Sequence, residues 1–262
     1  MSFDEMISLF SATLRMSTPL ILAAMGGLLS ERSGVIQIGL EGLMMVGGFT
    51  AAVGTLLFKD PWVGCLAAVF SGMMVSLVYS SLVVSLKANQ IVAGTAMNFL
   101  AMGLVPFISK ALYDNTGSTP SIPLENRLHW FGPVTVSFVA VLFLHWLLNS
   151  TPLGLWIRFA GEHPQALESS GRNVNQIRFF SVTIGGAFAA LGGAVLSLSF
   201  ASAYTRNMTG ARGFMALAAL IFGKWRAWPT LGACLLFGFS EALQNRLQAV
   251  SLPWHSGVTI PV

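Results

Sequence analysis

The chain has 262 residues and a formal net charge of +4, with only 9% charged residues against 54% hydrophobic ones. Soluble domains carry about 25% charged residues, so this composition excludes an ordinary soluble enzyme, a disordered protein and a DNA-binding domain. Its 14 basic residues are scattered singly and form no patch, so we expect no nucleic-acid partner despite the positive charge.

Apolar stretches long enough to cross a lipid bilayer recur along the chain. A spanning helix needs about 20 mainly apolar residues, and this criterion predicts spans at 7–29, 34–58, 61–86, 90–113, 134–150, 179–200 and 229–250. The run 211–222 is too short to cross alone, so it is either a re-entrant half-helix or, joined to 223–228, a tilted span. We therefore predict an all-α fold, a single polytopic membrane helix bundle over 1–262 with about seven spans plus this candidate half-helix.

Small residues recur every four positions in the predicted span 179–200. In lipid this spacing lets helix backbones approach closely, so we expect tight packing along two stripes: Gly185, Ala189 and Gly193, and Gly186, Ala190 and Ala194.

Glu41 is the first polar candidate, because it lies within the apolar stretch 34–58. Counted from Gly34 at about 1.5 Å per residue, it lies roughly 10 Å along the predicted helix. A charge at membrane depth costs about 2.5–3.5 kcal/mol, so such residues usually face a cavity or a partner. Glu41 is therefore either a polar group lining a solute path or a structural carboxylate bonded to a neighbouring helix.

Asn98 is the second candidate, about 12 Å along the predicted span 90–113. Gly94, Thr95 and Asn98 share one helix face, since residues three and four apart are neighbours. This polar stripe either borders a solute path or bonds to another helix, as Asn and Thr commonly do in bundles. Glu241, near the end of the last span, is read as interfacial or bonded to a neighbouring helix.

The chain carries no convincing enzyme site. It has no HExxH, GxSxG or phosphate-binding GxxxxGK[ST] motif, so any ATP that drives transport must be hydrolysed by a partner. Cys65 and Cys234 lie in apolar runs without metal-ligand spacing, so we predict no metal site and no cofactor.

The polar stretch 151–178 is the most informative loop. Pro164 suits the first turn of a short helix, where its missing N–H does no harm, and Gly171 suits the position after a helix. A short amphipathic helix between two spans is either a docking element for a soluble partner or a solvated connector.

Basic residues do not settle which side this loop faces. If 223–228 lies on the same side as 151–178, we count seven basic residues on each side; if the C-terminus does instead, the count is six against eight. The positive-inside rule does not discriminate between these arrangements.

Four ordered segments together resemble a known family, and the resemblance runs from about Pro19 to about Gln248. The segments are Leu29–Met45, Asn89–Asn98, Gly161–Gly171 and Gly210–Trp225. They are similar to the inner-membrane permease subunits of ABC importers for simple sugars and nucleosides, with ribose and branched-chain amino-acid permeases as more distant relatives. The similarity is greatest to the shorter of the two permeases in nucleoside importers.

The resemblance implies roles and partners. It makes 151–178 a cytoplasmic coupling loop, in which Glu162, Pro164, Ala166 and Gly171 belong to a coupling helix that docks on an ABC ATP-binding subunit. It places the substrate pathway beside Gln37, Glu41, Thr95, Asn98, Phe99 and Phe214. It also implies a second permease subunit, an extracytoplasmic substrate-binding lipoprotein and a location in the bacterial cytoplasmic membrane. The family pattern further includes a closing apolar span, and we see no such span in the sequence up to Val262.

Two other functions stay open at this stage. A secondary transporter or channel would use Glu41 as a proton or cation site. A structural subunit would have no solute path, and substitution of Glu41 and Asn98 would then leave uptake intact.

Overall fold

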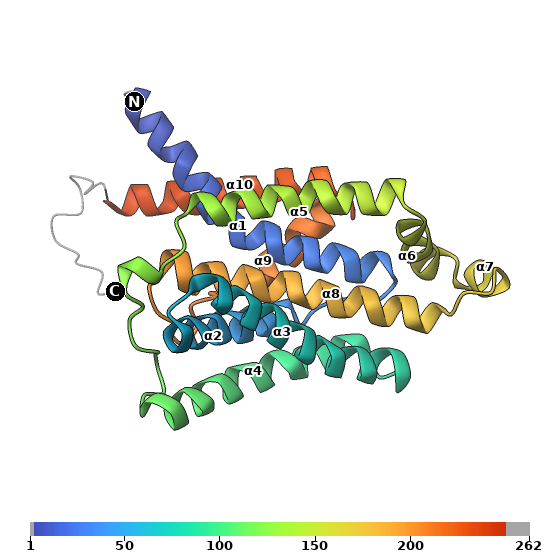
Figure 1. Ribbon diagram of the computed structural model, residues 1–262. Coiled ribbons are helices and arrows are strands. Elements are labelled where there is room, and N and C mark those ends of the chain that lie inside the picture. Colours follow the sequence, from blue (N-terminus) through green and yellow to red (C-terminus); the bar gives the residue numbers. More distant parts are fainter. Residues whose placement is uncertain (1–2, 250–262) are drawn as a thin grey trace.

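The computed structural model describes residues 3–249, and helices make up most of this range (Figure 1). The long helices are α1 (Phe3–Arg32), α2 (Leu40–Phe58), α3 (Pro61–Ser80), α4 (Gln90–Tyr113), α5 (Phe131–Ser150), α8 (Val174–Val195) and α10 (Ala227–Ala249). The shorter ones are α6 (Pro152–Glu162), α7 (Pro164–Ser169) and α9 (Arg212–Phe222). The π-helical turns η1 (Ser81–Ser85) and η3 (Leu196–Phe200) extend α3 and α8, and η2 (Leu124–Asn126) is a 3₁₀ turn.

The predicted all-α membrane bundle is confirmed. Among the described residues, six helices are long and apolar enough to cross a membrane. The seventh long helix, α10, does not meet the same criterion, because its C-terminal half carries Glu241, Gln244, Asn245 and Arg246. The seven long helices match the seven predicted spans; residue 250, the end of the last prediction, lies outside the described range.

The polar loops gather at two ends of the bundle. At one end, here called the α6–α7 end, Arg32 forms an ion pair with Glu162 (2.9 Å), and Arg178 Nε donates to the Ser33 carbonyl (3.1 Å). At the opposite end, the Thr119 N–H donates to the Tyr204 carbonyl (3.0 Å). Figure 1 shows α7 projecting beyond the spans at the α6–α7 end, and the start of α1 and the end of α10 at the opposite end.

Residues 201–222 connect these two ends, although only part of the segment is helical. Its first residues pair with 117–122 at the opposite end. The helical part, α9, has 11 residues and spans about 16 Å. Just beyond it, the Trp225 indole donates to Glu31 at the α6–α7 end. The predicted half-helix is therefore present, but it is not re-entrant: the chain leaves at the end opposite to the one it entered, and a turn at 223–226 separates α9 from α10.

Helix α8 lies at the centre and packs against α1, α2 and α3. The six small residues of its two predicted stripes are all buried. A Cβ on Gly185 would lie 2.5 Å from the Gly26 carbonyl oxygen of α1, and a Cβ on Gly193 would overlap the Met44 carbonyl oxygen of α2. The tight backbone packing predicted from the stripes is confirmed.

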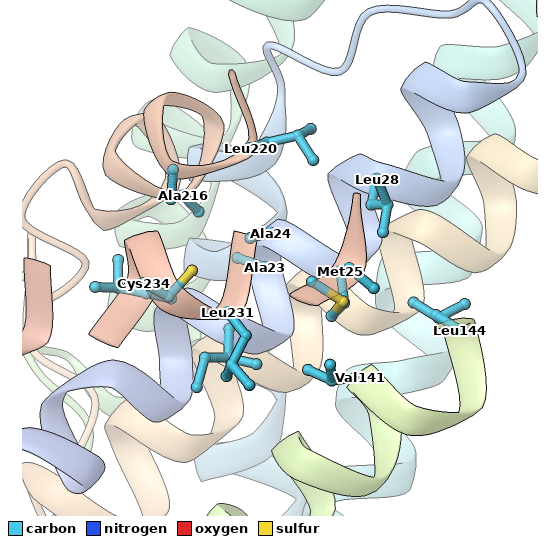
Figure 2. Close-up of a cluster of buried hydrophobic side chains, with 14 of the residues drawn as sticks. Ala23, Ala24, Met25, Leu28, Val141, Leu144, Ala216, Leu220, Leu231 and Cys234 are labelled. Atoms are coloured by element: carbon cyan, nitrogen blue, oxygen red, sulfur yellow. The ribbon is translucent and has the colours of Figure 1, made fainter. Parts of the chain in front are cut away.

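An apolar cluster fills the space beside α8. Figure 2 shows side chains of α1, α5, α9 and α10 meeting there, among them Met25, Val141, Leu220 and Cys234, all with no exposed surface. Because α9 contributes Ala216 and Leu220 to this cluster, the half-helix is held by burial on one side while its N-terminus meets α2.

Candidate functional site

A junction of three helices forms around Glu41, and α2 begins there because the backbone turns sharply before it. Gly34 has a φ of +88°, which glycine adopts without steric cost, and residues 34–39 are not helical. The predicted span 34–58 was wrong at its start, since α2 begins only at Leu40. Glu41 consequently lies in the first turn of α2 rather than two turns inside a helix.

The Glu41 carboxylate joins α2 to the N-terminus of α9. Its Oε1 accepts hydrogen bonds from the Thr209 hydroxyl (2.5 Å) and the Ala211 N–H (3.0 Å), and its Oε2 accepts one from the Gly213 N–H (2.7 Å). Glu41 is only 2% exposed. Both carboxylate oxygens are therefore occupied by donors of the chain itself.

Helix dipoles explain why a carboxylate is stable at this position. The first turns of helices carry unsatisfied N–H groups and a partial positive charge, which stabilise an anion. Glu41 lies in the first turn of α2 and accepts two N–H groups at the start of α9. Charge-assisted hydrogen bonds of this kind are roughly twice as strong as neutral ones, so the junction offsets much of the cost of burying the charge.

Asn98 fixes the other side of the α2 N-terminus. Its Oδ1 accepts from the Gly42 N–H (2.8 Å), and its Nδ2 donates to the Ile38 carbonyl (3.0 Å). The Asn98 side chain is 5% exposed and lies in α4, as the sequence predicted. It therefore ties α4 to both the connecting segment 34–39 and the first turn of α2.

The glycine at position 213 allows α9 to approach α2. A Cβ there would overlap the Glu41 nitrogen and lie 2.5 Å from the Glu41 Cα. Sequence analysis missed Thr209, Ala211 and Gly213 as partners of Glu41. The available signal was the run Gly210-Ala-Arg-Gly213 before an apolar stretch, which marks a turn into a helix.

The other pathway candidates lie around this junction. Gln37 is fully buried in the connecting segment, where its Oε1 accepts a hydrogen bond from Ser30 (3.4 Å). The Thr95 hydroxyl donates to its own helix, at the Ile91 carbonyl. Phe99 and Phe214, one residue past Asn98 and Gly213, are 68% and 45% exposed. The structure thus brings Gln37, Glu41 and Asn98 to one buried region, with both phenylalanines on the surface.

The second polar region of the molecule is α7 with its flanking turns. Pro164 occupies the first turn of α7 as predicted, and Gly171 follows it with a left-handed φ of +80°. Leu167 is 2% exposed and packs with Ala160 and Val174, which anchors the six-residue helix to α6 and α8. The remaining surface of α7, including Ala166, faces outward.

Glu162 ends α6 beside this helix and keeps a side-chain exposure of 58% while paired with Arg32. Beside the Glu41 junction, Arg212 at the start of α9 forms an ion pair with Glu241 of α10. Of the two alternatives left open for Glu241, this contact favours bonding to a neighbouring helix. Among the described residues, no group of three or more His, Cys, Asp or Glu side chains could hold a metal ion.

Comparison with known proteins gives consistent matches over nearly the whole chain. Residues 9–260 match the model of a family described as "Branched-chain amino acid transport system / permease component". The guanosine ABC transporter permease protein NupQ of Bacillus subtilis is 40% identical over 88% of this chain and 80% of its own length. A putative glucose ABC transporter permease protein, TsgC13 of Haloferax volcanii, is 34% identical (93% and 79%), and the nucleoside ABC transporter permease protein NupC of Lactococcus lactis is 31% identical (87% and 78%).

Proposed function

Because the chain belongs to the ABC-transporter family of permease components, multi-pass proteins of the bacterial cytoplasmic membrane, we propose that it carries a nucleoside across that membrane in an ATP-driven importer. The 40% identity to a guanosine permease supports this substrate class. A simple sugar is the second candidate, supported by the similarity to a putative glucose permease.

The family membership separates the competing functions. Permeases of ABC transporters work with ATP-binding and substrate-binding partners and are generally not enzymes themselves, which supports the importer and not a secondary transporter or channel. The geometry around Glu41 agrees, since its two oxygens already accept three hydrogen bonds from the chain and the residue is 2% exposed, which disfavours a cation site there.

The ATP-binding subunit docks, in this proposal, on α7. The helix projects from the end of the bundle (Figure 1), it is anchored by Leu167, and its outer face is free of contacts with the rest of the described chain. Glu162, Pro164, Ala166 and Gly171 form this contact surface or shape it. A force on α7 reaches the bundle through α6 and α8, because Arg32 holds Glu162 and Arg178 Nη2 donates to the Ala160 carbonyl (2.8 Å).

The solute passes, in this proposal, along the exposed faces of α4 and α9. Phe99 and Phe214 offer aromatic surface suited to stacking with a base, and Thr95 adds a half-buried hydroxyl. Gln37, Glu41 and Asn98 stand behind this surface and set the positions of α2, α4 and α9. A second permease subunit completes the path, and a lipoprotein delivers solute at the opposite end.

Competition for uptake tests the substrate. Cells that express the complete importer are expected to take up labelled guanosine, and excess unlabelled nucleoside should abolish that uptake while excess glucose leaves it unchanged. The reverse pattern would reassign the importer to sugars. Phe99→Ala and Phe214→Ala should each lower uptake several-fold, whereas uptake unchanged in both variants, with normal insertion, would support a structural subunit without a solute path.

A bulky substitution on α7 tests the docking surface. Ala166→Arg should prevent co-purification of the ATP-binding subunit and stop uptake, because the enlarged side chain keeps the exposed face of α7 from docking on that subunit. Ala88→Arg, at an exposed position of the same end, is the matched control and should retain both. Normal association and uptake with Ala166→Arg would refute the docking role of α7.

A further inference from the structure

A basic pocket opens at the α6–α7 end, and none of its lining residues belongs to α4 or α9. Its volume is about 320 Å³. It lies where three spans end or begin, at the end of α1, the end of α5 and the start of α10, with α6 as a further wall. The lining residues are Arg32, His145, Leu148, Asn149, Arg158, Trp225, Arg226, Ala227, Trp228 and Pro229.

Positive charge dominates this pocket. Three arginines line it and no carboxylate does. Two carboxylates contact residues of the lining: Glu162 pairs with Arg32, and Glu31 Oε2 accepts a hydrogen bond from the Trp225 indole, while Glu31 Oε1 is buried without a partner among the described residues. Within the described chain, neither Arg158 nor Arg226 forms an ion pair.

Two of the arginines also have donors without acceptors. The Nε atoms of Arg32 and Arg158 are buried from solvent, and neither has a hydrogen-bond partner among the described residues. A buried donor without a partner costs about 1–3 kcal/mol, and more when it is charged, so native proteins rarely leave one unsatisfied. Beside these buried atoms, the pocket presents the positive charge of three arginines, which no carboxylate among its lining residues balances.

The surroundings of the pocket select the kind of anion. Trp225 and Trp228, 40% and 48% exposed, stand at its rim, and tryptophan is enriched where spans meet the headgroup layer. On α5, Leu142, His145 and Asn149 follow one another at helical spacing along one face. Leu142, 53% exposed, continues that face from the pocket toward the middle of the membrane. A ligand with an anionic head and an apolar tail fits both features.

We propose that this pocket binds the phosphate of an anionic phospholipid headgroup, with the acyl chains lying along α5. Arg158 and Arg226 contact the phosphate directly, and Arg32 contacts it while holding Glu162. The site is separate from the substrate path and from the outer surface of α7, and basic pockets between spans are a known way of holding such headgroups. The lipid thereby covers the surface of the bundle between α5, α6 and the start of α10.

Native mass spectrometry of the complete importer, titrated with phosphatidylglycerol or with phosphatidylcholine of the same acyl chains, tests this site. Arg158→Gln and Arg226→Gln should each weaken phosphatidylglycerol binding about fivefold, given the contribution of one basic residue near an anionic membrane, and Arg158→Lys should restore most of it. Lys87→Gln removes one exposed charge at the same end and should change nothing. Because Arg158→Gln and Arg226→Gln are independent variants and Arg158→Lys keeps the charge, a folding defect in any one variant does not decide the test.

Four results would overturn the proposal. One is equal retention of the two lipids by the unmodified importer. Another is the same loss of phosphatidylglycerol in Lys87→Gln as in both pocket variants, which would indicate diffuse attraction. The third is full displacement of the lipid by inorganic phosphate, which would assign the pocket to a free anion. If the ATP-binding subunit shields the pocket, so that lipid binds only to the permease without it, the ligand is an acidic partner surface and the lipid assignment is wrong.

Discussion

The Glu41 junction and the basic pocket handle buried charge in opposite ways. At the junction, three donors of the same chain satisfy both oxygens of one carboxylate. In the pocket, two arginine Nε atoms are buried without any acceptor from the described chain. The charge of Glu41 is stabilised within the fold, whereas the arginines of the pocket line an open cavity at the membrane surface.

The difference separates a structural use of charge from a binding use. A carboxylate that caps a half-helix fixes where α9 starts and therefore where Phe214 lies. In the pocket, Arg158 and Arg226 form no ion pair within the described chain, so they leave positive charge for something outside it. Substitutions should accordingly affect folding at the junction and ligand retention in the pocket.

Removal of the Glu41 carboxylate is expected to have the largest effect on stability. Glu41→Ala leaves the Thr209 hydroxyl and two N–H groups buried without an acceptor, which should cost about 3–5 kcal/mol, the range for breaking a buried charged contact. Thermal unfolding of the purified complex in detergent measures this. Glu41→Gln keeps one acceptor oxygen and should lose less, while equal stability of Glu41→Ala and the parent protein would show that the junction does not hold α9.

A methyl group at position 213 tests the close contact between α9 and α2. Gly213→Ala should destabilise the protein by about 3 kcal/mol, at the upper end for overpacking, because the added Cβ meets backbone atoms of Glu41 that have little freedom to move. Gly232→Ala in α10 is the matched control, since nothing lies within 4 Å of its added Cβ. Similar unfolding midpoints for the two variants would contradict a close approach of the two backbones.

Loss of the Asn98 side chain should have an intermediate effect. Asn98→Ala leaves the Gly42 N–H and the Ile38 carbonyl without their partner, at a cost of about 2 kcal/mol. Thr95→Ala, one turn earlier in α4, removes a hydroxyl that bonds only to its own helix and should cost less than about 0.5 kcal/mol. Unfolding by denaturant separates the two, and a Thr95→Ala effect as large as that of Asn98→Ala would contradict this ranking.

The ion pair at the α6–α7 end should matter least for stability. Glu162→Gln removes a partly exposed contact with Arg32, and such pairs contribute about 0–1 kcal/mol. We expect an unfolding temperature close to that of the parent protein but reduced stimulation of ATP hydrolysis by substrate, because α6 transmits the movement of α7. Glu125→Gln at the opposite end is the control. Full stimulation of ATP hydrolysis in Glu162→Gln would show that this ion pair does not transmit the movement of α7.

Sequence patterns predicted the membrane bundle and much of its packing. Apolar length located the seven long helices, and the small residues of α8 indicated its close backbone packing, because both signals are local and periodic. Pro164 and Gly171 likewise marked the ends of α7, since the fixed φ of proline suits a first helical turn and glycine tolerates the left-handed conformation that follows a helix. The sequence analysis also singled out Glu41 and Asn98 by their polarity alone.

The partners of these residues could not be found in the same way. Glu41 meets Thr209, Ala211 and Gly213 across some 170 positions of chain, and no periodic pattern links segments so far apart. The start of α2 was placed too early because 34–39 is apolar enough to continue a helix. Tertiary hydrogen bonds hold it in another conformation, since the Gln90 Oε1 accepts from the Ile36 N–H and the Asn98 Nδ2 donates to the Ile38 carbonyl. The basic pocket was missed because its arginines come from α1, α6 and the turn before α10.

The energy source of uptake tests the central claim most directly. The complete importer, with both permeases, its ATP-binding subunit and its lipoprotein, is reconstituted into proteoliposomes, and labelled guanosine uptake is measured with and without ATP on the α7 side. The account predicts uptake that requires ATP and persists when a protonophore dissipates the proton gradient. Uptake without ATP that collapses with the protonophore would contradict it.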